Sequence, residues 1–445
     1  MKKAWKLLAL ALAGVLLLSL AACSQQEMMT TTDPISQTTG TQPTTQPTTQ
    51  PDKTPTLYID LTQPWSKPDV ESAYCAAFSD AGYYYRRDNY FLSFLDTSNG
   101  VSVTLCQKAG CTHSEEGREE CEAALPGTNL MFYDNGYIYY NKYNKLDGAS
   151  EAVHLFRRRE DGTAEEKVAM LGEGYFTSDN SIYVGELLAA DGILYYTLFT
   201  QEILRENEED IGTIVPRDGI LIRMDLRTGQ QQELLRQRDV QLRLLGARSD
   251  ALLFYAQDLP TGEQMLDGTY NDVLPRKTGR LKVWQREDNS LVTLFEKKEK
   301  DCNWILGMQN GKVYYYDQES VWTYDLAENV HTKEMLPYGF QLVSGDYILV
   351  GSEPGDFYNI YSRLMNLQTG QYLSGDFDNV ETAVKNRTDR GVVLEIRYHG
   401  EPYVNDLYQT VIPRLKTVLA YVDYDALADG LQNSELMIIR EANGF

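Results

Sequence analysis

Basic residues are scarce in this chain relative to acidic ones. Its 445 residues include 41 Lys and Arg against 64 Asp and Glu, so the formal net charge is −23. We expect no nucleic-acid partner, because binding a phosphate backbone requires clustered basic side chains. The same deficit argues against electrostatic attachment to anionic lipid.

The motifs of several common catalytic sites are also missing. The sequence contains no Gly-x-Ser-x-Gly elbow, no His-Glu-x-x-His helix, no phosphate-binding loop and no dinucleotide-binding fingerprint. Histidine occurs only four times, and His154, His331 and His399 each stand apart from any cysteine or carboxylate pattern. We predict structural roles for these three and expect no organic cofactor. The abundance of acidic residues leaves pairs of catalytic carboxylates open.

The N-terminal apolar run is too short to cross a membrane. It covers residues 7–20 and follows three lysines, which is the layout of a secretory signal peptide. The run ends in Leu20-Ala21-Ala22-Cys23, and a small-residue cleavage site that ends on a cysteine resembles the lipobox of bacterial lipoproteins. That resemblance implies removal of residues 1–22, acylation of the Cys23 thiol with fatty acids such as palmitate, and anchoring on the outer face of the cell membrane. The alternative is an ordinary signal peptide with a cysteine nearby by chance.

Residues 23–56 contain almost no apolar side chains. They include a run of Thr, Gln and Pro at 41–51, which cannot bury enough surface to offset the entropy of ordering. Proline stiffens such a chain, so we expect a disordered linker that reaches up to roughly 100 Å at about 3.1 Å per residue. We predict that this linker is a stalk for a folded domain at residues 57–445.

From residue 57 onward, a tight turn followed by an aromatic strand recurs along the chain. The clearest copies are Asp134-Asn135-Gly136-Tyr137, Asp191-Gly192-Ile193-Leu194 and Asn310-Gly311-Lys312-Val313. Asn-Gly and Asp-Gly favour the positive φ angles of two-residue hairpin turns. A second hairpin follows each of these, with alternating apolar and polar residues, as in residues 221–235 around Thr228-Gly229.

Two hairpins per repeat, recurring about seven times, predict an all-β domain with the architecture of a seven-bladed β-propeller. Each repeat would form a four-stranded sheet of roughly 35 to 60 residues, close to the length of known propeller blades. Radial repetition also leaves few long exposed sheet edges. Six or eight blades are the alternatives, and a β-sandwich does not explain a repeated unit of four strands. Either residues 57–61 or residues 436–439 would supply the final strand of the last blade.

The turns, aromatic strands and hairpins together resemble uncharacterised extracytoplasmic β-propeller lipoproteins of Gram-positive anaerobic bacteria, which are similar to the TolB-like group. The resemblance covers most of residues 57–445 and implies a propeller outside the cell membrane. It implies no reaction, because propellers host many unrelated functions.

One local group of residues has chemical content: Cys106, Cys111, His113 and Cys121. It lies in a polar loop predicted to follow the last strand of the first blade, and three thiols with one imidazole are the donors of a tetrahedral Cys3His zinc site. The spacing matches no standard zinc finger. A disulfide such as Cys111–Cys121 and free thiols are the alternatives, since the predicted location permits disulfides. A catalytic metal is not expected, because four protein ligands would close the site to water.

Other features of the sequence are weaker leads. Cys75 and Cys302 lie beside apolar residues and are predicted to be buried as small hydrophobic side chains. Two acidic insertions, at residues 201–217 and 257–280, interrupt blades between their second and third strands and would emerge on one face of the propeller. Loops on a rigid scaffold are common sites of recognition.

Three functions are compatible with these features. The first is a lipid-anchored, non-enzymatic binding or scaffold module that recognises a surface protein or a glycan. The second is a propeller enzyme that acts on carbohydrate through two carboxylates in the central channel. The third is a metal or redox sensor built on the Cys106, Cys111, His113 and Cys121 group.

Overall fold

The computed structural model of the chain separates into two units, Met1–Thr56 and Leu57–Phe445. The predicted signal peptide and nearly all of the predicted linker, including Cys23, lie outside the described residues. The structure describes residues 56–66, 76–87, 90–125, 130–145, 151–175, 180–204, 213–262, 277–298, 304–317, 320–336, 340–344, 346–351, 361–372, 380–387, 390–400, 403–404, 410–411, 414–428 and 436–443, with two single positions, 128 and 264, between them.

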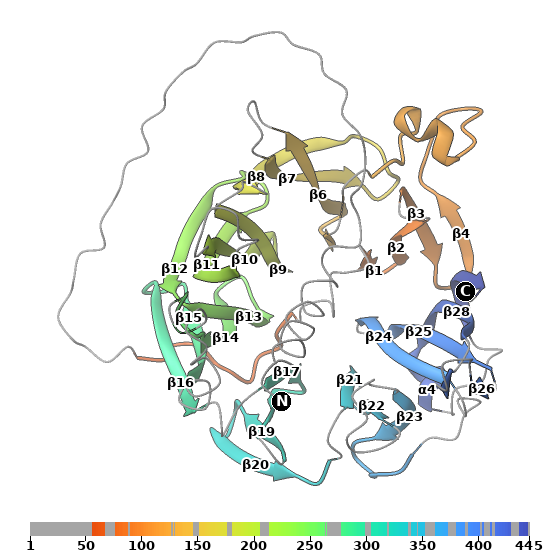
Figure 1. The fold of residues 1–445 in the computed structure, drawn as a ribbon. Coiled ribbons are helices and arrows are strands. Elements are labelled where there is room, and N and C mark those ends of the chain that lie inside the picture. The colour runs from red at the N-terminus through yellow and green to blue at the C-terminus, as the bar shows by residue number, and fades with distance from the viewer. Residues whose placement is uncertain are drawn as a thin grey trace, which may run out of the picture. The chain divides into compact units, whose positions relative to one another are not determined.

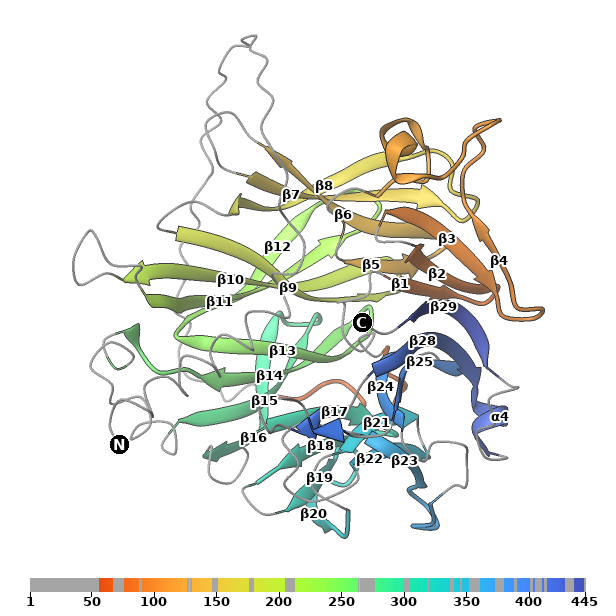
Figure 2. The same cartoon turned by 45° about the vertical axis from the view of Figure 1, so that its right-hand side comes forward.

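In the second unit, consecutive β-sheets are arranged around a ring (Figures 1 and 2). The first blade comprises β1 (Ala76–Ser79), β2 (Gly82–Arg87), β3 (Phe91–Asp96) and β4 (Val101–Thr104). The second comprises β5 (Met131–Asp134), β6 (Tyr137–Lys145), β7 (Glu151–Arg159) and β8 (Glu166–Tyr175). The third comprises β9 (Asn180–Ala190), β10 (Ile193–Leu204), β11 (Thr213–Asp225) and β12 (Gln231–Arg238).

The second half of the ring continues the same pattern. The fourth blade comprises β13 (Val240–Ala247), β14 (Ala251–Asp258), β15 (Thr278–Gln285) and β16 (Ser290–Lys298). The fifth comprises β17 (Trp304–Gln309), β18 (Lys312–Tyr316), β19 (Val321–Asp325) and β20 (Val330–Glu334). A three-stranded sheet follows, with β21 (Phe340–Ser344), β22 (Tyr347–Gly351) and β23 (Tyr361–Asn366). The C-terminal blade comprises β24 (Val380–Arg387), β25 (Gly391–His399), β28 (Arg414–Asp423) and β29 (Met437–Asn443).

The described residues therefore confirm an all-β propeller with six complete four-stranded blades. A two-stranded hairpin of β26 (Tyr403–Val404) and β27 (Thr410–Val411) lies between β25 and β28 along the chain. Helices among the described residues are short: a 3-10 helix, η2 (Glu115–Glu120), and α4 (Tyr424–Ala428). None of the helices in this part of the chain has the length and apolar character needed to cross a membrane.

Local turn chemistry explains much of the strand pattern. Asn135 and Gly136 have φ angles of 47° and 82°, and Asn310 and Gly311 have φ angles of 50° and 70°. Both positions of a type I′ hairpin turn require positive φ, which Asn and Gly adopt at low cost. The predicted hairpins β5–β6 and β17–β18 form at these turns.

The tyrosines of the repeats lie mainly in the hydrophobic core. Tyr84 and Tyr140 pack between the first and second blades, and Tyr195 packs between the third and fourth. Each consecutive pair of sheets shares such an apolar layer, and the C-terminal blade packs on the first through Leu95, Tyr421 and their neighbours. The ring therefore closes by side-chain packing.

The two closure alternatives are resolved by β29. This strand pairs with β28 and supplies the fourth strand of its own blade. The prediction that residues 57–61 might complete that blade is wrong. Leu61 and Trp65 are instead buried in the apolar layer between the fourth and fifth blades, and Ser66 and Ala247 exchange two backbone hydrogen bonds of 2.9 Å. The apolar side chains of this segment find a larger buried surface there than a strand edge would offer.

Candidate metal centre

The loop that carries the Cys/His group follows β4, as the sequence predicts, and both of its ends are fastened to β3. At its start, the Leu105 N–H donates a hydrogen bond of 2.9 Å to the Leu92 carbonyl. At its end, the Leu92 N–H donates to the Ala123 carbonyl at 2.8 Å, and the Leu125 N–H donates to the Tyr90 carbonyl at 2.7 Å. The loop leaves β4, and both of its ends are hydrogen-bonded to the neighbouring residues Tyr90 and Leu92, so the two ends are held close together.

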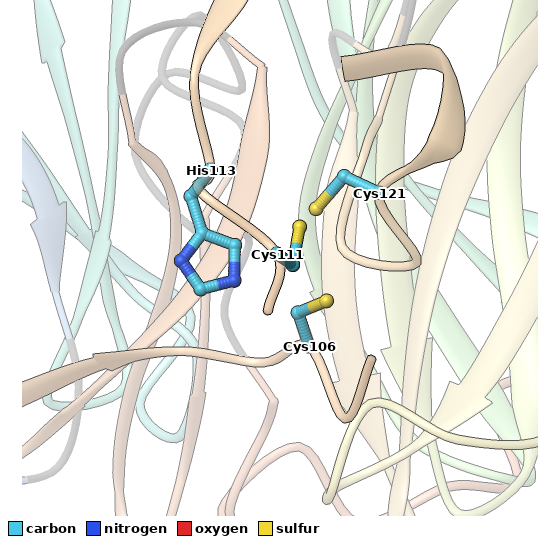
Figure 3. A group of neighbouring side chains, drawn as sticks. All are labelled: Cys106, Cys111, His113 and Cys121. Carbon is cyan, nitrogen blue, oxygen red and sulfur yellow. The ribbon is translucent and has the colours of Figure 1, made fainter. Parts of the chain in front are cut away.

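Cys106, Cys111, His113 and Cys121 converge inside this loop (Figure 3). One ligand atom from each residue lies within 4.8 Å of all the others, and the three cysteines are free thiols. A tetrahedral zinc ion with bonds of about 2.3 Å to sulfur requires donor separations of about 3.8 Å. A contraction of about 1 Å would therefore close the group around an ion, and the cluster can hold a metal.

The hydrogen bonding of the His113 ring is compatible with a role as a metal ligand. Its Nε2 atom is buried, and no hydrogen-bond partner for it is found among the described residues. A buried ring nitrogen without a partner has a desolvation cost that a metal bond would remove. The ring lies edge-on to Phe91, with ring centroids 6.3 Å apart, which limits its freedom to rotate.

Two unusual backbone positions shape the loop. Gly110 has a φ of 75°, and His113 has a φ of 50°. The Cys111 N–H donates a hydrogen bond of 3.2 Å to the Lys108 carbonyl, which turns the chain back toward Cys106. The left-handed conformation of His113 turns the chain at this residue.

The thiols lie in different electrostatic environments. Partial burial acts to raise the pKa of Cys106, but the Lys108 backbone N–H and the neighbouring His113 and Cys111 side chains outweigh it and lower the pKa to about 6. Burial raises the pKa of Cys121 to about 12. Cys106 therefore ionises more readily than Cys121, and a bound metal would deprotonate the thiols that are still protonated, with release of protons.

Polar contacts around the ligands brace the loop from outside. The Lys108 ammonium donates to the Glu120 carboxylate at 2.9 Å and to the Glu120 carbonyl at 3.2 Å. The Gln107 N–H donates to the Glu122 carboxylate at 3.3 Å. These bonds join the segment after Cys106 to the segment around Cys121, so the two halves of the ligand set are held together.

The other candidate residues are only partly described. Cys75 and Cys302 lie outside the described residues, as do residues 205–212 and 265–276 of the two acidic insertions; the insertions do fall between β10 and β11 and between β14 and β15, but these strands extend further into them than predicted. His154 lies buried on β7, and the Tyr315 hydroxyl and His331 Nδ1 are 2.8 Å apart. The His399 side chain also lies outside the description.

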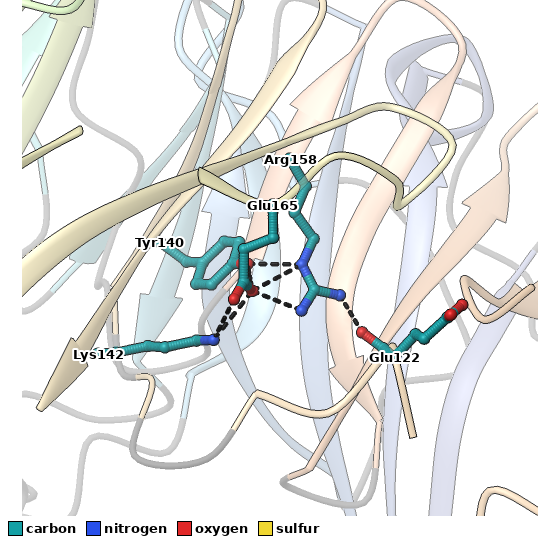
Figure 4. Close-up of polar contacts among 5 residues, drawn as sticks. All are labelled: Glu122, Tyr140, Lys142, Arg158 and Glu165. Carbon is teal, nitrogen blue, oxygen red and sulfur yellow. Dashed lines mark hydrogen bonds and ion pairs between the residues drawn. The ribbon is translucent and has the colours of Figure 1, made fainter. Parts of the chain in front are cut away.

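Sequence reasoning missed the buried polar group beside the loop. Arg158 on β7 and Glu165 in the β7–β8 connection form an ion pair that reaches the carbonyl of Glu122 (Figure 4). Adjacent arginines in a strand carry no signal of such a role, because the partner carbonyl is 36 positions away in the sequence.

Comparison with known proteins identifies no family, since no family model and no curated protein matches the sequence, and it gives only weak likenesses to solved structures. Similar solved structures include oligogalacturonate lyase from Vibrio parahaemolyticus, with 14% identity over 78% of this chain and 94% of that one and a TM-score of 0.44. An oligogalacturonate lyase in complex with manganese has 12% identity over 75% and 88%, with a TM-score of 0.43. TolB from Acinetobacter baumannii has 13% identity over 72% and 74%, with a TM-score of 0.32. Likenesses this low transfer neither activity nor metal to this chain.

Proposed function

We propose that this chain is a lipid-anchored, extracytoplasmic β-propeller that acts as a non-enzymatic binding or scaffold module and contains a structural zinc ion. Cys106, Cys111, His113 and Cys121 would hold the ion. The convergence of three free thiols and one half-buried imidazole, whose Nε2 atom is buried, supports this proposal. Four protein ligands leave no open position for water or substrate, which is the arrangement of a structural zinc site.

The proposed propeller has seven blades. The three-stranded sheet packs between the fifth and C-terminal blades through its own apolar layers. An isolated bridge between Met365 and Tyr372 lies beside β23, at the position of a fourth strand. This arrangement supports counting the sheet as a blade.

Polar contacts between the inner strands of neighbouring blades are compatible with a rigid scaffold. The first strands of neighbouring sheets contact one another, including β9 and β13. On these two strands, the Glu186 carboxylate lies 3.4 Å from Arg243 Nε and accepts a hydrogen bond from the Leu244 N–H. This carboxylate has structural partners from the neighbouring blade, so it contributes to the contact between the third and fourth blades.

The metal is tested by elemental analysis of the purified protein together with thiol titration. We expect one zinc per chain and its loss in Cys111→Ser and Cys121→Ser, whereas the control Cys302→Ser keeps it. A mass lower by two protons per cysteine pair, with no metal, would show a disulfide and reject the zinc site. Accessible thiols with neither metal nor bridge would reject both.

The anchor and the binding role need separate tests. Mass spectrometry of the mature N-terminus should find acylated Cys23, and Cys23→Ser should release the protein from membranes. Pull-down from solubilised membranes should enrich one surface protein or glycan reproducibly. Turnover in a glycan panel that a carboxylate substitution abolishes would instead identify an enzyme.

A further inference from the structure

Arg158 reaches from the second blade into the Cys/His loop of the first. Its side chain is 7% exposed, and its Nη1 donates a hydrogen bond to the carbonyl of Glu122. That carbonyl belongs to the residue directly after Cys121. Figure 4 shows the guanidinium between this carbonyl on one side and Glu165 on the other.

The guanidinium is itself held rigidly. Arg158 Nε donates to the Tyr140 hydroxyl at 2.6 Å and to the Glu165 carboxylate at 2.9 Å. Lys142 Nζ lies 2.8 Å from the same carboxylate. A buried arginine needs hydrogen-bond acceptors and an opposite charge as partners. Because its guanidinium is planar, the partners on its two sides are held in fixed positions relative to each other. The position of the Glu122 carbonyl is therefore tied to three side chains of the second blade.

A second contact joins the start of the loop to the same blade. Gly162, in the turn between β7 and β8, has a φ of 81°. A Cβ atom added there would lie 2.8 Å from the Leu105 Cβ and 2.9 Å from the Leu105 carbonyl oxygen. Leu105 directly precedes Cys106. Both segments that deliver ligands, one at Cys106 and one at Cys121, thus rest on the β7–β8 hairpin.

We propose that the metal centre is a clamp between the first and second blades, and that Arg158 is the positioning residue that couples it to the second blade. This inference rests on the proposed zinc site. The Glu122 carbonyl lies in the peptide group that follows the Cys121–Glu122 peptide bond, so fixing it restricts the backbone next to Cys121 and with it the direction of the Cys121 sulfur. Coupling is reciprocal: a contact that improves metal affinity is stabilised to the same extent by the metal.

Arg157 provides a matched control. It is the preceding residue of β7, and its side chain lies on the opposite side of the second blade, at the contact with the third blade. It pairs with Glu166 and donates a hydrogen bond of 3.4 Å to the Leu226 carbonyl of the third blade. The two arginines share a strand and a side-chain type, but only Arg158 contacts the Cys/His loop in the described contacts.

The test compares zinc affinity, by chelator competition, in the full chain and in Arg158→Gln and Arg157→Gln. Outer contacts of metal ligands typically change affinity by about 10- to 100-fold, so we expect that loss for Arg158→Gln and less than about a 2-fold change for Arg157→Gln. Arg158→Lys keeps the positive charge but loses the planar guanidinium, so its zinc affinity should lie between those of the unsubstituted protein and Arg158→Gln. It replaces the glutamine variant in the comparison if that variant does not fold.

Hydrogen exchange supplies the second readout. Zinc should slow exchange in residues 151–171 of the unsubstituted protein and should not do so in Arg158→Gln. If the protein binds zinc and Arg158→Gln binds it equally well, the coupling is rejected while the zinc site stands. If the unsubstituted protein binds no zinc, both proposals fail.

Discussion

The first blade is held on its two sides by different kinds of contact. Its seam with the second blade combines an apolar layer with the Cys/His loop and the buried Arg158–Glu165 pair. Its seam with the C-terminal blade is an apolar layer in which Leu95 and Tyr83 meet Leu419 and Tyr421. The Arg390 guanidinium adds a hydrogen bond of 3.1 Å to the Asp80 carbonyl across this closing seam.

The difference shows two ways of joining blades. Apolar packing is non-directional and tolerates small sliding movements, so it suits the closing seam, where no strand is exchanged between the ends of the ring. Metal ligands and a guanidinium fork are directional, so they fix one relative placement of two blades. We expect the two seams to respond to different perturbations.

Removing the metal should have the largest effect and should be confined to the first seam. A ligand present at 1,000 times its dissociation constant stabilises a protein by about 4 kcal/mol, so chelation should lower the free energy of unfolding by about that amount. Denaturant unfolding with and without chelator measures it. Faster exchange in β28 and β29 of the C-terminal blade, equal to that in β7 of the second blade, would contradict the comparison.

Leu419→Ala should weaken the closing seam in a metal-independent way. Leu419 is buried in the layer shared with the first blade, and truncating a buried leucine typically costs about 3 kcal/mol. The chelator should destabilise this variant by the same amount as the unsubstituted protein, since the two seams have no residue in common. Loss of the chelator effect in Leu419→Ala would show that the seams are coupled.

Glu165→Gln should have a smaller, pH-dependent effect at the first seam. Partial burial acts to raise the pKa of Glu165, but hydrogen bonds from Lys142 and Tyr140 and the charge of Arg158 outweigh it and lower the pKa from 4.5 to about 2. A lowered pKa means that the carboxylate stabilises the fold fully above about pH 4.5 and that this contribution is lost as the pH falls to about 2.

At neutral pH we expect Glu165→Gln to lower the free energy of unfolding by about 2 kcal/mol, after allowance for solvent screening of this partly exposed group. Between pH 4.5 and 2 the variant should lose less stability than the unsubstituted protein. The measurement uses zinc-free protein in both cases, because acid also releases zinc. If the free energies of unfolding of the two proteins fall by the same amount between pH 4.5 and 2, the stabilising role of the Glu165 carboxylate is contradicted.

Prediction from the sequence succeeded where the contacts are local. The turns at Asn135-Gly136 and Asn310-Gly311 follow from the φ angles of two neighbouring residues. The Cys/His group spans only residues 106–121, so a single loop could bring it together. The placement of Leu61 and Trp65 against the fourth and fifth blades was not predicted. An apolar segment can pack into any of several apolar layers, and its own sequence does not distinguish between them.

By itself, the sequence determined the strand-turn repeat, the all-β class and the four donor side chains, because each depends on residues near one another along the chain. Tertiary structure alone decided which strand closes the C-terminal blade, where residues 57–66 pack, and which arginine of an adjacent pair faces the Cys/His loop. These outcomes depend on contacts between distant segments, whose free energies arise only once the blades have assembled.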